Sequence, residues 1–142
     1  MGMSRSENMR RIRSTGTLPE IRVREAIGRL GFRGYRNNNR VILGNPDIVW
    51  SRKKVAVFVN GCFWHAHGCA EGIRKPKSNR EYWIPKLTEN RMRDRRNRHI
   101  LRSRGWRILT IWECQISSMD STASKLRVFL CNSGLRRASV AR

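Results

Sequence analysis

The stretch that decides the fold is NPDIVWSRKKVAVFVNG, residues 45–61. It holds two short apolar runs, DIVW (47–50) and VAVFV (55–59), which are rich in β-branched and aromatic residues and are separated by the basic turn SRKK. Runs of this length on either side of a polar turn predict two strands of a hairpin-like meander. Pro46 stands at the start of the first strand, where a missing backbone donor is tolerated.

Helices are predicted on both sides of this strand pair. In TLPEIRVREAIGRLGF (17–32), Thr17 can cap a helix, Pro19 suits its first turn, and apolar residues recur at helical spacing. Gly31 is expected to end this helix.

The remaining elements follow in a clear order. Residues 61–79 are rich in Gly, Cys, His and Lys and are expected to form an ordered loop. A long helix is predicted over 78–105, and Pro85 requires either that it starts after the proline or that its first turn is kinked. A strand over 106–116 and a closing helix over 121–130 complete a small mixed α/β sheet with helices on its faces.

The chain length of 142 residues suits one domain. We expect a basic N-terminal arm over 1–16, a folded domain over 17–131 and a basic C-terminal tail over 132–142. No apolar stretch approaches the roughly 20 residues of a membrane span, and no secretory signal is recognised. A reducing, cytoplasmic compartment is therefore expected, in which cysteines serve as thiols or metal ligands.

Charge is the strongest global feature of the composition. The chain has 31 Lys and Arg residues against 10 Asp and Glu, for a formal net charge of +21. A field of this size attracts polyanions and favours nucleic-acid binding, whereas the alternative is a solvated basic surface. Both readings also apply to an arginine-rich part of the long helix, where the side chains either contact phosphates or form a solvated face: Arg91, Arg93, Arg95, Arg96 and Arg98.

A thiol and imidazole pattern predicts a structural zinc site. Three candidate ligands lie close together and a fourth follows the last predicted strand: Cys62, His67, Cys69 and Cys114. Such a set suits tetrahedral zinc, although buried free thiols and a core histidine are the alternative. His65 is a further possible ligand, which spacing alone does not exclude. Cys131 is expected to be a small core residue of the closing helix.

Candidate acids for a second metal are few. Asp47, after a proline at the mouth of a strand, resembles the first motif of PD-(D/E)XK nucleases, in which carboxylates bind a divalent cation. The second strand has neither the acid nor the Lys of that motif, so the pattern is incomplete. Glu20 could approach Asp47 if its helix packs on the sheet, whereas a turn Asp and a dipole-compensating Glu are the alternatives.

The order of five segments resembles that of one known family, and in chain order the segments are SRSENMRRIRSTGTLPEIRVREAI, PDIV, FVNGCFWHAHGC, SNREYWIPKLTENRMRDRR and GWRILTIWEC. The family that they resemble is the very short patch repair (Vsr) DNA mismatch endonucleases, and the resemblance extends from about Ser4 to Cys114. The resemblance implies a restriction-endonuclease-like single domain with a structural zinc. It also implies an Mg²⁺-dependent nick 5′ to the thymine of a T:G mismatch, leaving a 5′-phosphate and a 3′-hydroxyl. Because such mismatches arise when 5-methylcytosine deaminates, a companion cytosine methyltransferase is expected in the same genome.

The resemblance also implies roles for individual residues. Asp47 matches the metal-binding Asp, Glu20 the supporting acid and His65 the histidine expected to act as general base. Some family members have Thr and His where this chain has Val59 and Asn60. The main-chain carbonyl of Val59 can still serve the metal, whereas Asn60 can hydrogen-bond a water or phosphate but cannot exchange a proton at neutral pH.

Two further groups of residues match the family. The zinc ligands correspond to the four thiol and imidazole residues named above. The aromatic residues expected to wedge into the duplex beside the mismatch are Phe63, Trp64 and Trp83, and unstacking costs least at a mispaired step.

Two other functions remain open at this point. One is a zinc-stabilised nucleic-acid-binding module without catalysis, and the other is a related nicking nuclease with a different target. The expected partner is double-stranded DNA with a T:G mismatch, and a mismatch-repair scaffold protein is a further candidate. The chain is expected to act as a monomer in the bacterial cytoplasm, associated with the nucleoid.

Overall fold

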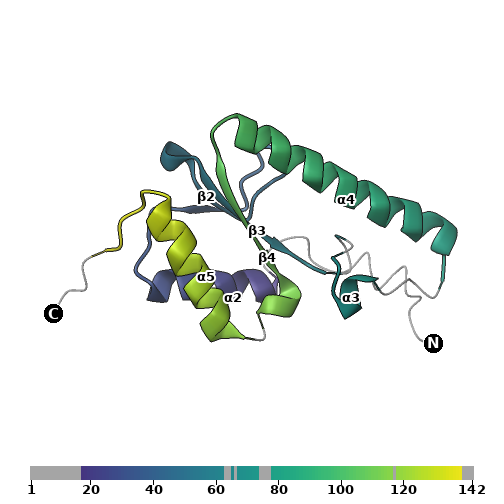
Figure 1. The fold of residues 1–142 in the computed structure, drawn as a ribbon, viewed down its shortest axis with the longest axis horizontal. Coiled ribbons are helices and arrows are strands. Elements are labelled where there is room, and N and C mark those ends of the chain that lie inside the picture. The colour runs from purple at the N-terminus through teal and green to yellow at the C-terminus, as the bar shows by residue number, and fades with distance from the viewer. Residues whose placement is uncertain (1–16, 63–64, 66, 74–77, 117, 139–142) are drawn as a thin grey trace.

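A four-stranded sheet with helices on both faces forms the centre of the molecule (Figure 1). The structure is a computed structural model that describes residues 17–62, 65, 67–73, 78–116 and 118–138. The predicted mixed α/β arrangement is confirmed. No described helix is both long enough and apolar enough to span a membrane.

The strands lie in the order β1 (Arg36–Asn37), β2 (Ile48–Trp50), β3 (Val55–Asn60) and β4 (Arg107–Trp112). β2 is antiparallel to both β1 and β3, whereas β3 and β4 are parallel. The predicted strand pair at 47–59 is therefore a hairpin, closed by a 3-10 turn, η1 (Ser51–Lys53).

A long helix connects the two parallel strands, because a parallel pair cannot be joined by a tight turn. This helix is α4 (Arg80–Ser103), and the short α3 (Ala70–Ile73) lies in the loop before it. α4 begins before Pro85 and continues through it, which excludes one of the two alternatives, a helix that starts after the proline. The strand predicted to reach residue 116 ends earlier, and the chain turns into the 3-10 segment η2 (Glu113–Gln115).

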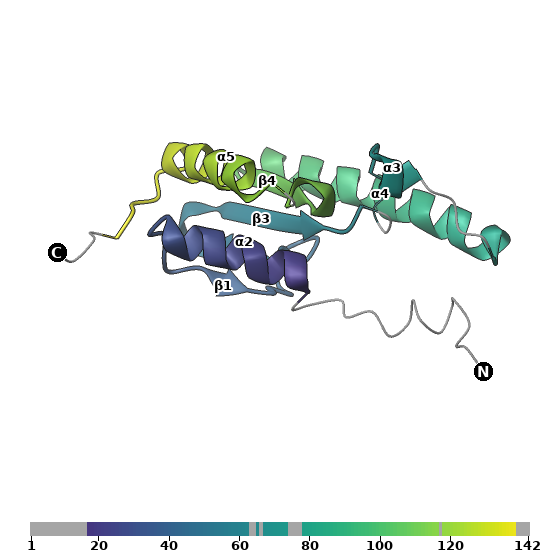
Figure 2. The same cartoon turned by 90° about the horizontal axis from the view of Figure 1, so that it is seen from below.

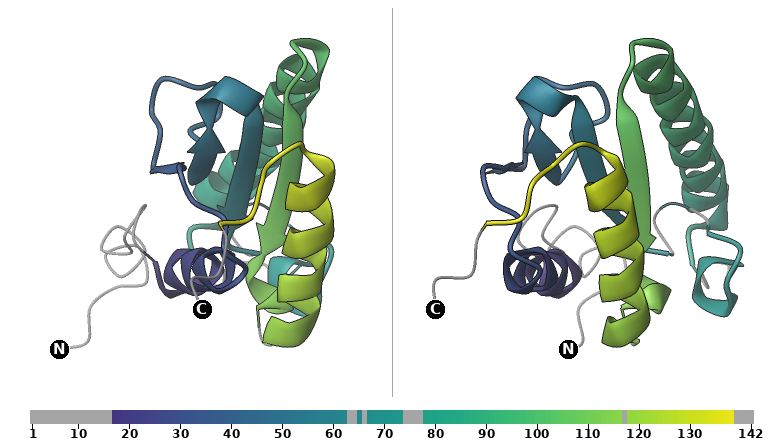
Figure 3. Two further views of the ribbon diagram at one scale, coloured as in Figure 1. Left: turned by 90° about the vertical axis from the view of Figure 1, so that its left-hand side faces the viewer. Right: turned by 60° about the vertical axis from the view of Figure 1, so that its left-hand side comes forward.

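The two faces of the sheet are covered by different helices. α2 (Leu18–Arg29) and α5 (Met119–Asn132) lie on one face and α4 lies on the other (Figures 2 and 3). Alternation along β3 explains this layering, because successive side chains point to opposite faces. Val55, Val57 and Val59 belong to the core beneath α2 and α5, and Ala56 and Phe58 to the core on the other face.

The ends of α2 follow the predicted signals. Thr17 occupies the N-cap position, although its side chain makes no capping hydrogen bond, and Gly31, at φ +89°, ends the helix as expected. The residues after α5 return to this end, where the Ala138 amide donates to the Gly31 carbonyl at 2.7 Å. The N-terminal arm predicted over 1–16 lies outside the described residues.

Cys131 was expected to be a core residue of the closing helix, and this is wrong, because its side chain is exposed. The buried positions of α5 are Thr122, Leu126 and Leu130, which share one face at a spacing of four residues. One further residue turns the side chain about 100° away from that face.

Candidate active site and metal centre

The carboxyl ends of β3 and β4 bring two distant cysteines together. Asn60 is paired with Trp112 at the end of the parallel ladder. Cys62 and Cys114 each lie two residues further along, so they emerge at the same edge of the sheet. The Cys114 amide donates to the Cys62 Sγ at 3.3 Å.

The loop after β3 supplies two more potential ligands. It turns back on itself where the His67 amide donates to the Cys62 carbonyl at 2.9 Å. Cys69 lies just before α3, where its carbonyl accepts from the Ile73 amide at 3.0 Å. The ligand atoms of Cys62, His67, Cys69 and Cys114 all lie within 4.8 Å of one another, and we call these four residues the thiol–histidine cluster.

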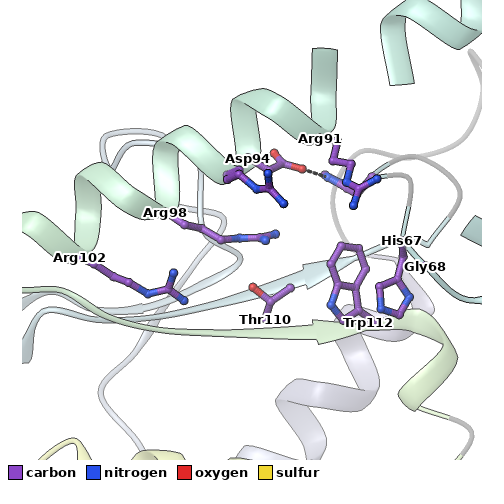
Figure 4. Close-up of a pocket in the computed structure, with 10 residues that line it drawn as sticks. His67, Gly68, Arg91, Asp94, Arg98, Arg102, Thr110 and Trp112 are labelled. Carbon is purple, nitrogen blue, oxygen red and sulfur yellow. Dashed lines mark hydrogen bonds and ion pairs between the residues drawn. The ribbon is translucent and has the colours of Figure 1, made fainter. Parts of the chain in front are cut away.

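The geometry of the thiol–histidine cluster fits a tetrahedral metal ion. Zinc bonds of about 2.0–2.3 Å give a tetrahedron with edges of about 3.3–3.8 Å. The Cys114 Sγ and the His67 Nδ1 are 3.6 Å apart, which lies within that range. The imidazole of His67 is held by stacking on the Trp112 indole, with ring centroids 4.1 Å apart and planes at 11° (Figure 4).

The environment of Cys62 also calls for a cation. Its side chain is buried, and burial raises the pKa of the thiol to about 12, with the neighbouring thiols adding to the effect. A thiolate at this position therefore needs a positive charge beside it, which a bound metal ion supplies.

A pair of carboxyl groups forms on the α2 face. The Asp47 Oδ2 accepts a hydrogen bond of 2.6 Å from the Val59 amide, which ties the start of β2 to the end of β3. The side chains of Asp47 and Glu20 are hydrogen-bonded to each other. Glu20 is buried on α2 although it is charged in water, and the Arg24 guanidinium lies 3.9 Å from its carboxylate. The predicted approach of these two acids is present in the structure.

Electrostatics at this carboxyl pair favour a cation. Burial and, to a lesser degree, the charge of Glu20 raise the pKa of Asp47 to about 7, against the opposite effect of the Val59 amide. Near neutral pH Asp47 is thus partly protonated in the absence of a metal ion. Hard carboxylate oxygens that gather in this way are the ligands that Mg²⁺ prefers.

His65 is not part of the thiol–histidine cluster, although spacing alone allowed it as a ligand. Its Nδ1 is instead hydrogen-bonded to the Asp94 carboxylate, and both side chains are half-buried. Because a carboxylate accepts the proton of Nδ1, the neutral ring presents an unprotonated Nε2 that can accept another proton. The imidazole also lies edge-on to the Trp112 ring, 6.3 Å between centroids.

Asp94 is the residue of this site to which sequence reasoning assigned no role. It is the only acid between Glu89 and Glu113, in a segment dense with arginine. Its isolation in this basic segment was the only signal that the sequence offered. The sequence could not show that α4 passes over the loop of His65.

The aromatic residues are only partly described. Phe63 and Trp64, predicted to contact DNA, lie outside the described residues. Trp83 is buried at the start of α4, with 7% of its surface exposed, so it is not presented to solvent in this conformation. Its neighbour Tyr82 is 58% exposed and packs edge-on against it, at 4.9 Å between ring centroids. Asn60, predicted to contact a water or phosphate, is also buried.

Comparisons with known proteins identify the family that this chain resembles. Residues 2–71 match the family model described as DNA mismatch endonuclease Vsr. A protein of Escherichia coli K12 named DNA mismatch endonuclease Vsr is 32% identical over 136 residues, which cover 92% of this chain and 86% of that protein.

Two other relatives are described as type II nicking enzymes. V.XorIIP of Xanthomonas oryzae pv. oryzae is 40% identical over 122 residues, covering 86% of this chain and 88% of that protein. V.NaeI of Lentzea aerocolonigenes is 44% identical over 118 residues, covering 80% of this chain and 69% of that protein.

Proposed function

Because this chain belongs to the Vsr family of DNA mismatch endonucleases, we propose that it nicks one DNA strand 5′ to the thymine of a T:G mismatch. The names of its relatives support a DNA endonuclease that cuts a single strand. The observation that carries the proposal is the presence of a carboxyl pair, Asp47 with Glu20, and a separate carboxylate–histidine pair, Asp94 with His65. A net charge of +21 suits a DNA substrate.

The carboxyl pair is the proposed magnesium site. Asp47 and Glu20 supply hard oxygen ligands, and the main-chain carbonyl of Val59 is a third candidate. When bound, Mg²⁺ neutralises phosphate charge and lowers the pKa of water. The Val59 amide holds the Asp47 side chain in place through the hydrogen bond of 2.6 Å.

The proposed base is the imidazole of His65. Asp94 accepts the proton on Nδ1 and thereby leaves Nε2 free to remove a proton from the attacking water. The oxygen of this water forms the new bond to phosphorus while the bond from phosphorus to O3′ breaks, and O3′ takes up a proton from solvent water. The products are a 3′-hydroxyl and a 5′-phosphate. Asn60 cannot take over this proton transfer, so the mechanism needs one histidine and not two.

The thiol–histidine cluster is the proposed structural zinc site. With four protein ligands it has no open position for substrate, which is typical of structural zinc. It fixes the loop that carries His65, because its ligands His67 and Cys69 follow that residue by two and four positions. Zinc thus braces the base, and magnesium serves the chemistry at the carboxyl pair.

Recognition of the mismatch is assigned to the aromatic residues Phe63, Trp64 and Trp83. Inserting a ring into the stack costs a few kcal/mol, and the cost is least at a mispaired step. Because Trp83 is buried here, its insertion requires the start of α4 to rearrange on DNA.

The remaining assignments complete the proposal. The chain is a restriction-endonuclease-like single domain over residues 17–131, with basic extensions at 1–16 and 132–142, and it acts as a monomer. It works in the bacterial cytoplasm on nucleoid DNA that a companion cytosine methyltransferase has modified. A mismatch-repair scaffold protein is the proposed recruiting partner.

The proposal is tested with end-labelled duplexes that carry either one T:G mismatch or a T:A pair at the same position. The wild-type chain with Mg²⁺ is expected to nick the T strand of the mismatched duplex. Asp47→Asn is expected to bind the same duplex and to leave it intact. Binding without nicking by the wild type would favour the non-catalytic binding module, and equal nicking of other mismatches would favour a nuclease with another target.

A further inference from the structure

A cavity of about 340 Å³ lies between α4 and the sheet, on the face opposite α2 and α5. Four arginines of α4 line it: Arg91, Arg95, Arg98 and Arg102. Thr110 and Trp112 of β4 also line it, as do His65 and Asp94. We call it the arginine cavity. In Figure 4, Arg98 and Arg102 extend from α4 toward Thr110 and Trp112.

The spacing of these arginines places them along one stripe of the helix. Their positions advance by four, three and four residues, which is the repeat of a single helix face. The stripe extends along about 16 Å of the helix axis. Arg93 and Arg96 do not line the cavity and are exposed elsewhere on α4. The arginine-rich run is therefore divided between the cavity and other faces of the helix.

The arginine cavity holds more donors than acceptors. Among its lining residues Asp94 is the only acid, and its carboxylate is already bonded to His65. The Nε of Arg98 is buried and has no hydrogen-bond partner among the described residues. The guanidinium instead lies over the Trp112 ring, 5.8 Å from its centroid. A buried donor without an acceptor is costly unless a ligand supplies one.

Electrostatics support the same conclusion. Burial lowers the pKa of the Arg98 guanidinium, the charge of Arg102 lowers it further, and Asp94 acts in the opposite direction. The cavity thus concentrates positive charge in a partly desolvated space. Guanidinium groups present paired N–H donors that match the oxygens of a phosphate group.

We propose that the arginine cavity is a phosphate site that holds a backbone phosphodiester of the DNA strand close to the catalytic histidine. The proposal rests on the proposed function, because DNA supplies the phosphodiester. His65 lies in the wall of the same cavity, so a phosphate bound by Arg98 and Arg102 positions the neighbouring nucleotides at the imidazole.

The direct test follows the Nε–H signal of Arg98 by ¹H–¹⁵N NMR of the zinc-loaded full chain, with the signal assigned by its loss in Arg98→Gln. An uncleaved T:G duplex without Mg²⁺ is expected to shift this signal, because Nε gains an acceptor. Inorganic phosphate tests the other source of the same chemistry. A shift with phosphate but none with DNA overturns the assignment to a backbone phosphodiester, and no shift with either overturns the site.

A second test compares two double variants with the same change in charge. Log K falls as log salt rises, and each lost phosphate contact makes this negative slope shallower by about 0.9. Arg98→Gln with Arg102→Gln is expected to make the slope shallower by about 1.8, so that the loss of affinity between 50 and 200 mM salt is about 12-fold smaller than in the wild type. Arg93→Gln with Arg96→Gln, the matched control, is expected to change it much less.

Equal slopes for the two double variants would show that the cavity has no special role and would overturn the proposal. Nicking of the T:G duplex by the wild-type chain is measured in parallel. If the wild type nicks and the NMR signal does not move, the phosphate site fails alone. If the signal moves with DNA and no mismatch is nicked, the phosphate site stands and the proposed function fails.

Discussion

Replacing Asp47 with Asn is expected to stabilise the metal-free protein at high pH while removing its activity. The amide keeps an oxygen that can accept from the Val59 amide, so the hydrogen bond to the end of β3 is retained. What the substitution removes is a buried charge beside Glu20. The effect therefore measures the cost of burying this charge, to which repulsion by Glu20 adds and which a bound cation would relieve.

The size of the effect follows from the pKa of Asp47, which burial and Glu20 raise from 3.8 to about 7. Between these values the folded chain holds a proton that the unfolded chain has released, so stability falls as the pH rises. A shift of about three pH units corresponds to about 4 kcal/mol at pH values above the folded pKa. For a chain of this size that difference raises the melting temperature by on the order of 10 °C.

The assay is thermal unfolding of wild type and Asp47→Asn between pH 4 and pH 8.5 without divalent cations. Near pH 4 the two curves are expected to coincide, and the variant is expected to become progressively more stable as the pH rises. Adding Mg²⁺ at pH 8 is expected to stabilise the wild type and not the variant, because only the wild type has the complete ligand set. Glu25→Gln, which removes an exposed carboxylate of the helix that carries Glu20 and leaves Asp47 in place, is the matched control and is expected to follow the wild-type stability at every pH.

Equal melting temperatures of wild type and Asp47→Asn at pH 8 would refute the reasoning. So would a wild type that becomes more stable relative to the variant as the pH rises. Either result would mean that Asp47 does not retain a proton in a buried site near neutral pH. The magnesium site would then have to be sought elsewhere.

Three further predictions concern the histidine, the cluster and the aromatic residues. Asp94→Asn is expected to lower the nicking rate by roughly 100-fold or more without loss of zinc, because the imidazole loses the group that fixes its tautomer; an unchanged rate would exclude the pair from catalysis. Cys114→Ser is expected to lose bound metal, measured by atomic absorption, and to melt at lower temperature, whereas Cys131→Ser, exposed on α5, keeps both; retention of a full equivalent of zinc by Cys114→Ser would contradict the cluster. Replacing Phe63 and Trp64 together with Ala is expected to preserve folding and zinc content but to abolish the preference for a mismatch; unfolding would instead assign them to the core.

The sequence predicted the framework of the fold because its signals are local. Two short apolar runs around a basic turn predicted the hairpin at 47–59, and Gly31 marked the end of α2 where the chain adopts a positive φ. The ends of helices and strands that depend on tertiary contacts were predicted less well. α4 begins before Pro85, and the last strand ends at Trp112 where the chain turns toward the thiol–histidine cluster.

The candidate site divides in the same way. Spacing identified the thiol–histidine cluster, because three of its ligands are close in sequence and the fourth follows a strand. Spacing could not place Asp94 beside His65, since that contact depends on how α4 crosses the sheet. The exposure of Cys131 also depends on which face of α5 packs, and one residue of rotation is enough to reverse the prediction.

The central claim is that this chain nicks one strand at a T:G mismatch. Mapping of the products at nucleotide resolution tests it most directly, using duplexes labelled on either strand and carrying T:G, T:A or another mismatch. We predict a nick 5′ to the mispaired thymine, on that strand only, with a 5′-phosphate product and a rate roughly 100-fold above that on T:A, as a difference of a few kcal/mol in unstacking implies. Equal cleavage of T:G and T:A duplexes, or cleavage of both strands, would contradict the account.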